Sequence, residues 1–398
     1  MRLGHCCRIV PASLFLSLIL CMPRCVAGQE PERAPATGTG SFAIAPQFES
    51  AGTFSEGLAA VQTGEDEYGK WGYIDKTGKF AIEPEFDAAE AFSEGLAAVR
   101  VGDDKTGKWG YIDEAGKMVI APRWDHAGAF ARGLAIVRMG DLLTGKERVI
   151  DTKGNLVTDL TGDVVTLCAN GLTLVGVTVG WNDQGVNRRY RFVDAAKKPA
   201  TSAAYDDALC FTEGLAVVRI GEGDTARWGF IDAAGNFVLR AQWGGADAFV
   251  DGMATVALAG TVTPVWGAID RSGQTVIPME FAEPLVFHEG MAVVSGTAHA
   301  WVSDEAGRTS IATVTRYGFI NKTGSRPFGG QWQAVFPFSD GLAAVQAGED
   351  ATGRWGYIDM QGRYAVQPQF EEAQPFAEGL AAVRVRGEKT NKWGYIRR

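Results

Sequence analysis

The stretch Phe92-Ser93-Glu94-Gly95-Leu96-Ala97-Ala98-Val99, followed by Trp109-Gly110-Tyr111-Ile112-Asp113, recurs almost unchanged along this chain. Each copy begins with an anchoring residue, and successive anchors lie mostly 38 residues apart, with wider gaps before Phe211 and Phe338. The anchors are Phe54, Phe92, Phe130, Cys168, Phe211, Phe249, Phe287, Phe338 and Phe376. A fixed period of this length indicates a tandem array, here of nine units.

Each unit is predicted to be all-β and to contain three short strands, shown here on the second copy. These strands cover residues 96–100, 109–113 and 117–120, and Pro122 ends the third. The turn Asp113-Glu114-Ala115-Gly116 favours a tight hairpin between the last two strands. Gly110 leaves room for an aromatic ring or a backbone segment of the adjacent unit. A glycine also stands three residues after every anchor, which predicts positive φ there.

The regular aromatic residues favour a core stacked between units over a carbohydrate-binding platform. A second aromatic row, six residues before the anchors, supports this interpretation: Phe48, Phe86, Trp124, Tyr205, Trp243, Phe281, Trp332 and Phe370. An acidic row precedes the fixed glycines, and a basic row precedes the Trp-Gly pairs. The acidic row is predicted to pair with the basic row in structural charge ladders. Its members are Glu56, Glu94, Glu213, Asp251, Glu289, Asp340 and Glu378, and the basic residues include Lys70, Lys108, Arg227, Arg354 and Lys392.

The array starts with residues 41–46, which match a third strand, and finishes with residues 393–396, which match a second strand. Pairing these two segments would complete the last unit and remove two sheet edges. The pattern therefore favours a propeller-like closed ring slightly over an open curved β-solenoid.

Residues 1–28 have a basic start, an apolar run and small residues at Val26-Ala27-Gly28, which is the order of a secretory signal peptide. Residues 29–40 are expected to be a flexible linker, and residues 41–398 the repeat array. Removal of the three basic residues of 1–28 changes the net charge from −9 to −12 (−9 − 3). We expect an exported monomer, periplasmic or extracellular, that binds no nucleic acid and keeps no membrane segment after signal removal.

Two cysteines remain after the signal, Cys168 and Cys210, in neighbouring units. An exported protein can join such a pair in a disulfide. Because Cys168 occupies the anchor slot while Cys210 precedes one, two buried thiols are an equal alternative.

The third and fourth units depart from the pattern, which indicates either local drift or a binding patch. Two connections are enlarged, one near Trp181 and one containing His299 and Trp301. Insertions in repeat proteins cluster on one face, often the binding face. These three residues lie outside the repeat register and are the candidate ligand contacts.

Chemistry-bearing motifs are scarce. The three histidines of the mature chain are scattered, and no phosphate loop, nucleophile elbow or zinc pattern occurs. We therefore expect no enzymatic activity, no catalytic residues, no metal and no cofactor. The carboxylates recur with the repeat, as structural groups do.

Lys108-Trp109-Gly110-Tyr111-Ile112-Asp113, together with Phe92-Ser93-Glu94-Gly95-Leu96-Ala97, resembles the WG-repeat (KWG) family of bacterial tandem β-rich repeats. The resemblance implies architecture and a bacterial source, and it implies neither a substrate nor catalytic residues. The expected function is an exported, non-catalytic binding scaffold for a protein or a cell-envelope component. A carbohydrate or cell-wall binding module and a glycan hydrolase are the alternatives.

Overall fold

A computed structural model describes residues 40–64, 69–140, 145–157, 163–168, 170–182, 185–194, 196, 198–303, 309–348, 353–385 and 391–398. Side chains at some strand positions of the enlarged hairpins and their neighbours also lie outside the description. All described residues belong to the compact unit Gly38–Arg398. The predicted signal peptide, residues 1–28, lies outside the described residues, as does the predicted linker up to residue 39.

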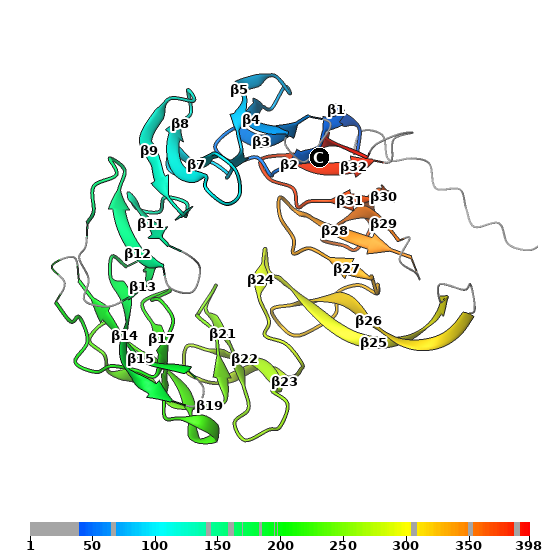
Figure 1. Cartoon of the computed structure of the whole chain (residues 1–398). Helices are drawn as coiled ribbons and strands as arrows, with labels where there is room; N and C mark the ends of the chain where they lie inside the picture. Colours follow the sequence, from blue (N-terminus) through cyan, green and yellow to red (C-terminus); the bar gives the residue numbers. More distant parts are fainter. Residues whose placement is uncertain are drawn as a thin grey trace, which may run out of the picture. The chain divides into compact units, whose positions relative to one another are not determined.

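The regular secondary structure of the described residues is almost entirely β, in nine antiparallel sheets that follow one another along the chain (Figure 1). Six sheets have four strands: β2 (Ser50–Ala51), β3 (Leu58–Thr63), β4 (Lys70–Asp75), β5 (Phe80–Phe86); β6 (Ala88–Ala89), β7 (Leu96–Val101), β8 (Lys108–Asp113), β9 (Met118–Trp124); β16 (Asp207–Ala208), β17 (Ala216–Ile220), β18 (Arg227–Ile231), β19 (Phe237–Trp243); β20 (Gly245–Ala246), β21 (Met253–Ala257), β22 (Trp266–Asp270), β23 (Thr275–Phe281); β27 (Ala334–Val335), β28 (Leu342–Ala347), β29 (Arg354–Asp359), β30 (Tyr364–Phe370); and β31 (Glu372–Ala373), β32 (Leu380–Val385), β33 (Lys392–Arg397) with β1 (Phe42–Phe48).

Three sheets have three strands: β10 (His126–Ala127), β11 (Leu134–Met139), β12 (Lys146–Asp151); β13 (Asp163–Leu167), β14 (Thr173–Asn182), β15 (Gly185–Val193); and β24 (Phe287–His288), β25 (Met291–Ser303), β26 (Thr309–Asn321). A 3-10 turn covers Gly223–Thr225. No described helix has the length and apolar character needed to cross a bilayer.

The three-stranded unit was incomplete as a prediction, because a two-residue strand before the anchor adds a fourth strand to most sheets. The third strand also continues through Pro122 to Trp124. Proline is tolerated because β9 pairs only with β8 and so lies at a sheet edge.

The Trp-Gly pair faces a bulge in the third strand. Trp109 pairs with Trp124 and Tyr111 with Ile120, so two steps along β8 match four along β9. This bulge lies against Gly110, where a Cβ would be 2.4 Å from the carbonyl oxygen of Ile120. The predicted space at Gly110 is therefore filled by backbone of the same sheet, and the expectation of an adjacent unit was wrong.

The core lies between consecutive sheets. Tyr111 of β8 is fully buried against Phe130 of the next unit, with ring centroids 4.7 Å apart. Its hydroxyl donates to the carbonyl oxygen of Gly128 at 2.8 Å, so the polar end of the ring is satisfied. Trp109, by contrast, is only half-buried. The tyrosine row is thus core, while most of the tryptophan row is only half-buried, with Trp393 the buried member.

The turn after each phenylalanine anchor is a two-residue hairpin turn with two left-handed residues, whereas after the Cys168 anchor only Gly171 of the described turn residues is left-handed. Glu94 has φ 56° and Gly95 has φ 75°, and Ser93 and Leu96 exchange both backbone hydrogen bonds. A glutamate in this conformation costs about 1 kcal/mol or more. The Glu94 carboxylate offsets this strain by accepting hydrogen bonds from the backbone amides of Arg132 and Gly133 in the next unit.

These turn carboxylates link unit to unit, and they do not form the predicted ladder with the basic row. In each described bond a backbone amide donates to the carboxylate of the linked unit: Glu94 and Gly95 to Glu56, Arg132 and Gly133 to Glu94, Gly252 to Glu213, Gly341 to Glu289, Gly379 to Asp340, and Gly57 to Glu378. The last of these joins the final unit to the first.

The first and last strands also meet. Strand β1 pairs antiparallel with β33, for example Phe48 with Trp393, and completes the final sheet (Figure 1). Tyr395 donates its hydroxyl to the carbonyl oxygen of Gly52 at 2.8 Å.

A disulfide joins Cys168 to Cys210, with their Cα atoms 5.1 Å apart. It connects the sheet β13–β15 to the sheet β16–β19. In the third and fourth units the residue before the fixed glycine is Arg132 and Asn170, respectively, instead of an acid. The covalent bond therefore lies where the carboxylate links of the array are interrupted.

We expect the Glu378 link to weaken in acid. The Lys76 ammonium, 2.9 Å away, lowers the pKa of Glu378 against the opposing effect of burial, and the Gly57 amide adds to the lowering. A lowered folded-state pKa gives stability that is present above the unfolded pKa and lost as pH falls through the folded value. Glu378→Gln should therefore reduce unfolding free energy by up to about 1 kcal/mol at pH 7 and by less near pH 3.

Thermal midpoints of wild type and variant at pH 7, 5 and 3 test this. Glu85→Gln, which removes an exposed carboxylate of β5, is the control and should follow wild type. A Glu378→Gln deficit that stays constant down to pH 3 would contradict the assignment.

Candidate functional site

The three sequence-predicted contacts lie on long strands, and the enlarged connections are extended hairpins where loops were expected. Trp181 lies in β14 and pairs with Val186, while His299 and Trp301 lie in β25 and pair with Thr313 and Ile311. Their side chains are outside the described part of the structure. The strands belong to different sheets, so the topology does not place Trp181 in one sheet with His299 and Trp301.

The basic row has its own carboxylate partners, at the beginning of the following unit. Lys108 contacts Asp125 at 2.5 Å, and the second oxygen of Asp125 accepts the Gly140 amide at 2.8 Å. The Lys108 ammonium and this amide lower the pKa of Asp125, so it is ionised at neutral pH. The same pairing occurs for Lys70 with Asp87, Arg189 with Asp206, Arg354 with Glu371 and Lys392 with Glu49.

The pairing is broken at Arg227, because the equivalent of its carboxylate partner is Gly244. The Arg227 guanidinium instead donates from Nη1 to the carbonyl oxygens of Asp224 and Ala226, each at 2.7 Å. These neutral carbonyls accept hydrogen bonds from Nη1 but do not neutralise the charge of the guanidinium. Arg227 is therefore a half-buried cation without the carboxylate that Lys70, Lys108, Arg189, Arg354 and Lys392 have.

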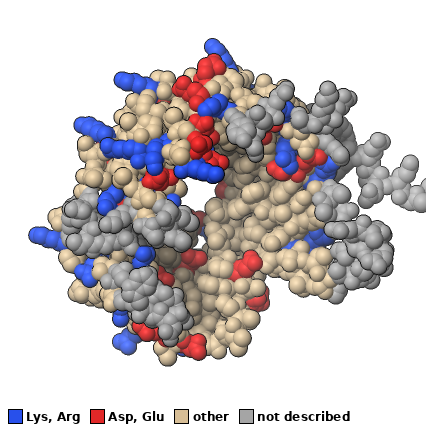
Figure 2. Space-filling view, in the orientation of Figure 1, with Lys and Arg blue, Asp and Glu red and all other residues tan. Residues whose placement is uncertain are grey.

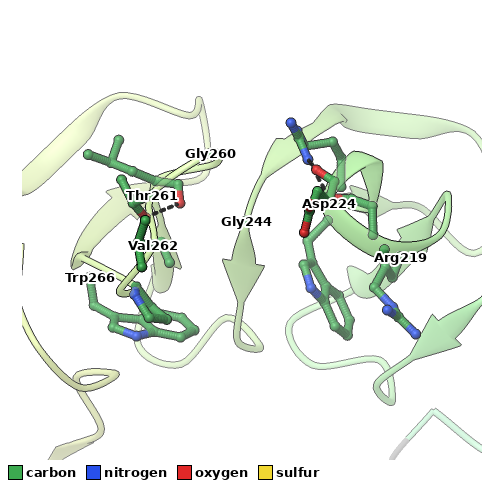
Figure 3. A pocket seen from close by; sticks show the side chains of 14 residues that line it. Arg219, Asp224, Gly244, Gly260, Thr261, Val262 and Trp266 are labelled. Carbon is green, nitrogen blue, oxygen red and sulfur yellow. Dashed lines mark hydrogen bonds between the residues drawn. The ribbon is translucent and has the colours of Figure 1, made fainter. Parts of the chain in front are cut away.

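A pocket of about 480 Å³ opens at this position, between the β17–β18 and β21–β22 connections. Figure 3 shows Gly244 between the two sides, with Asp224 and Arg219 on one side and Gly260, Thr261 and Val262 on the other. Arg227, Trp228 and Trp266 also line it. The pocket therefore lies where Gly244 lacks a carboxylate side chain, and it opens beside the Arg227 guanidinium.

The aromatic residues of the pocket are two members of the half-buried tryptophan row. Arg219 lies over the Trp228 ring at 5.8 Å from its centroid. Its distance to the Asp207 carboxylate is 3.9 Å, at the limit of an ion pair, and its buried Nε has no hydrogen-bond partner. The pocket therefore combines two arginines with two indole rings and the Asp224 side chain.

This arrangement suits binding of a polar or anionic group beside an aromatic surface. Within the described ranges, no cluster of three or more His, Cys, Asp or Glu side chains could hold a metal ion. On the face in Figure 2, basic and acidic side chains lie beside one another, as the pairing of the basic row implies.

Sequence reasoning missed this pocket because it paired the basic row with the wrong acids. The usable signal was a single glycine: Asp87, Asp125 and Asp206 precede Gly244 at the same repeat position. The importance of this glycine depends on the basic residue 17 positions earlier, which contacts the carboxylate in other units, as Lys108 contacts Asp125. Only the correct strand register reveals that contact.

The family model described as "WG containing repeat" matches eight stretches that together cover more than half of the chain: residues 38–65, 71–105, 109–142, 190–223, 228–260, 266–295, 317–349 and 355–393. The chain belongs to this family of WG-repeat proteins. The unmatched interval 143–189 includes parts of the third and fourth units, whose departure from the pattern was noted above. No curated protein sequence matches the chain.

Solved structures give only remote likenesses. An uncharacterized protein of Listeria monocytogenes EGD-e is 11% identical, with 70% of this chain and 93% of that chain covered and a TM-score of 0.38. Hsv2 of Kluyveromyces lactis is 11% identical, with 67% and 95% covered and a TM-score of 0.32. An acylaminoacyl peptidase of Pyrococcus horikoshii is 10% identical, with 86% and 58% covered and a TM-score of 0.36.

Proposed function

We propose that this WG-repeat protein is a non-catalytic binding scaffold whose ligand site is the pocket at Gly244. The observation that carries the proposal is Arg227, which opens onto a pocket and lacks the carboxylate that five of its counterparts contact. The pocket opens beside Arg227, so a ligand group can approach the guanidinium from the pocket. The proposed partner is a component of the cell envelope, and the protein acts as a monomer without a cofactor.

We also propose that the nine sheets close into a propeller-like ring. Pairing of β1 with β33 and the bond from Glu378 to the Gly57 amide support closure, since both join the last unit to the first. Closure would leave neither of these strands as a free sheet edge.

Export to the periplasm or the cell exterior follows from the expected signal peptide and gains support from the Cys168–Cys210 disulfide, because such bonds persist in oxidising compartments. A glycan hydrolase is less favoured. Many of the described carboxylates make repeated structural bonds, to backbone amides or to the basic row, whereas a catalytic pair occurs once.

Retention of the purified protein on cell-envelope preparations tests the binding role. Trp266→Ala removes one indole ring of the pocket and should reduce retention about tenfold, since buried aromatic contacts dominate binding sites. Trp71→Ala changes the equivalent residue of β4, away from the pocket, and should retain wild-type binding. Equal loss in both variants, or no retention of wild type, would overturn the proposal.

A further inference from the structure

We propose that the pocket binds a carboxylate-bearing saccharide, with the sugar carboxylate paired to Arg227. This inference rests on the proposed binding function and names the chemical class of its ligand. The ligand carboxylate would supply, from the pocket, the negative charge that an Asp or Glu side chain supplies to Lys70, Lys108, Arg189, Arg354 and Lys392.

The equivalent arginines of other units show which chemical group this position contacts. In the equivalent position, Arg354 Nη1 lies 3.2 Å from the Glu371 carboxylate, and Arg189 Nη1 lies 2.9 Å from Asp206. The residue equivalent to these carboxylates is Gly244, which has no side chain to contact Arg227. The backbone at Leu258 covers Gly244, since a Cβ there would lie 2.6 Å from the Leu258 carbonyl oxygen. The connection to β22 thus excludes an internal carboxylate while the pocket stays open beside the cation.

The second arginine strengthens the preference for an anion. Arg219 lines the same pocket and is held to its own carboxylate, Asp207, at only 3.9 Å. Arg219 and Arg227 outnumber Asp224 among the charged residues that line the pocket, although the whole chain is acidic. Arginine also matches a planar carboxylate with two parallel hydrogen bonds.

The remaining lining favours a saccharide over an acidic peptide. Trp228 and Trp266 offer ring faces on which a sugar ring can stack, and the Asp224 carboxylate and Thr261 hydroxyl can bond to sugar hydroxyls. An acidic peptide offers carboxylates but neither ring hydroxyls nor a sugar ring face. Each unit of a uronic-acid oligomer carries a carboxylate for Arg227 together with a ring and several hydroxyls for the tryptophan, Asp224 and Thr261 side chains.

Calorimetric titration with oligogalacturonate, a neutral glucose oligomer and a short polyglutamate tests the inference. Oligogalacturonate should bind wild type at least about tenfold more tightly than the other two, and added salt should weaken it. Arg227→Gln should lower that affinity about tenfold or more, whereas Arg354→Gln, whose Glu371 partner is present, should leave it unchanged.

Three results would overturn the inference: equal binding of the neutral oligomer, preference for polyglutamate, or an Arg227→Gln variant with wild-type affinity. If envelope material is retained through Trp266 but oligogalacturonate does not compete with it, the binding function stands and the carboxylate assignment fails. Thermal midpoints of both arginine variants confirm that the compared proteins are folded.

Discussion

Replacing Gly110 with alanine is expected to destabilise the protein by about 3 kcal/mol or more. The new Cβ would lie 2.4 Å from the Ile120 carbonyl oxygen and 2.8 Å from the Pro122 nitrogen. Both atoms are backbone of the bulge in β9, so no side chain can rotate away. Relief requires separation of β8 from β9, which would break the pairing of Trp109 with Trp124. The midpoint of chemical unfolding measures the effect.

Gly296 provides the matched control for a glycine in a strand. It lies in β25, and a Cβ there would meet nothing within 4 Å. Gly296→Ala should be neutral or slightly stabilising, because alanine lowers the entropy of the unfolded chain. If Gly110→Ala unfolds with wild-type stability, the bulge does not lie against Gly110.

Loss of the Cys168–Cys210 disulfide is expected to cost about 2–4 kcal/mol. The bond closes a long loop, with a sequence separation of 42 residues, and so restricts the unfolded chain. It also joins the fourth and fifth units, where Asn170 stands in place of the turn carboxylate that links units elsewhere, for example Glu94. Unfolding of a Cys168→Ala/Cys210→Ala double variant should therefore begin in this part of the array, as hydrogen exchange of β14 and β17 can show.

Reductant supplies the control for the disulfide. Wild-type protein should lose stability when reduced, and the double variant should be insensitive to the same treatment. Equal response of both proteins would show that the reductant acts elsewhere. Unchanged stability of the double variant would mean that packing of neighbouring units alone holds this interface.

Much of the fold could be predicted because the chain repeats its own pattern. The alternation in residues 109–113 predicts a strand, and the turn at Asp113 predicts the hairpin that β8 and β9 form. The short strand Ala88–Ala89 was missed, since two residues carry no periodicity. The course of β9 through Pro122 was missed as well, because an edge position that tolerates proline is a property of the sheet.

The site was harder to predict because it depends on a residue that is missing. Large and unusual side chains such as Trp181 and Trp301 attract attention in a sequence, whereas Gly244 is one of 51 glycines. Its significance comes from the contact of Lys108 with Asp125 in another unit, which strand register and chain direction create together. No local pattern contains that information.

Completion of the last sheet by β1 has a kinetic consequence. Most strands pair with neighbours in sequence, but the contact of Tyr395 with Gly52 spans 343 residues. Closing a loop of that size costs about 3–4 kcal/mol more chain entropy than closing a short hairpin. We therefore expect the pairing of β1 with β33 to form late in refolding, after the internal sheets. Until that step, β1 and the last strand would each expose an unpaired edge, and concentrated chains at this stage would be prone to pair with one another.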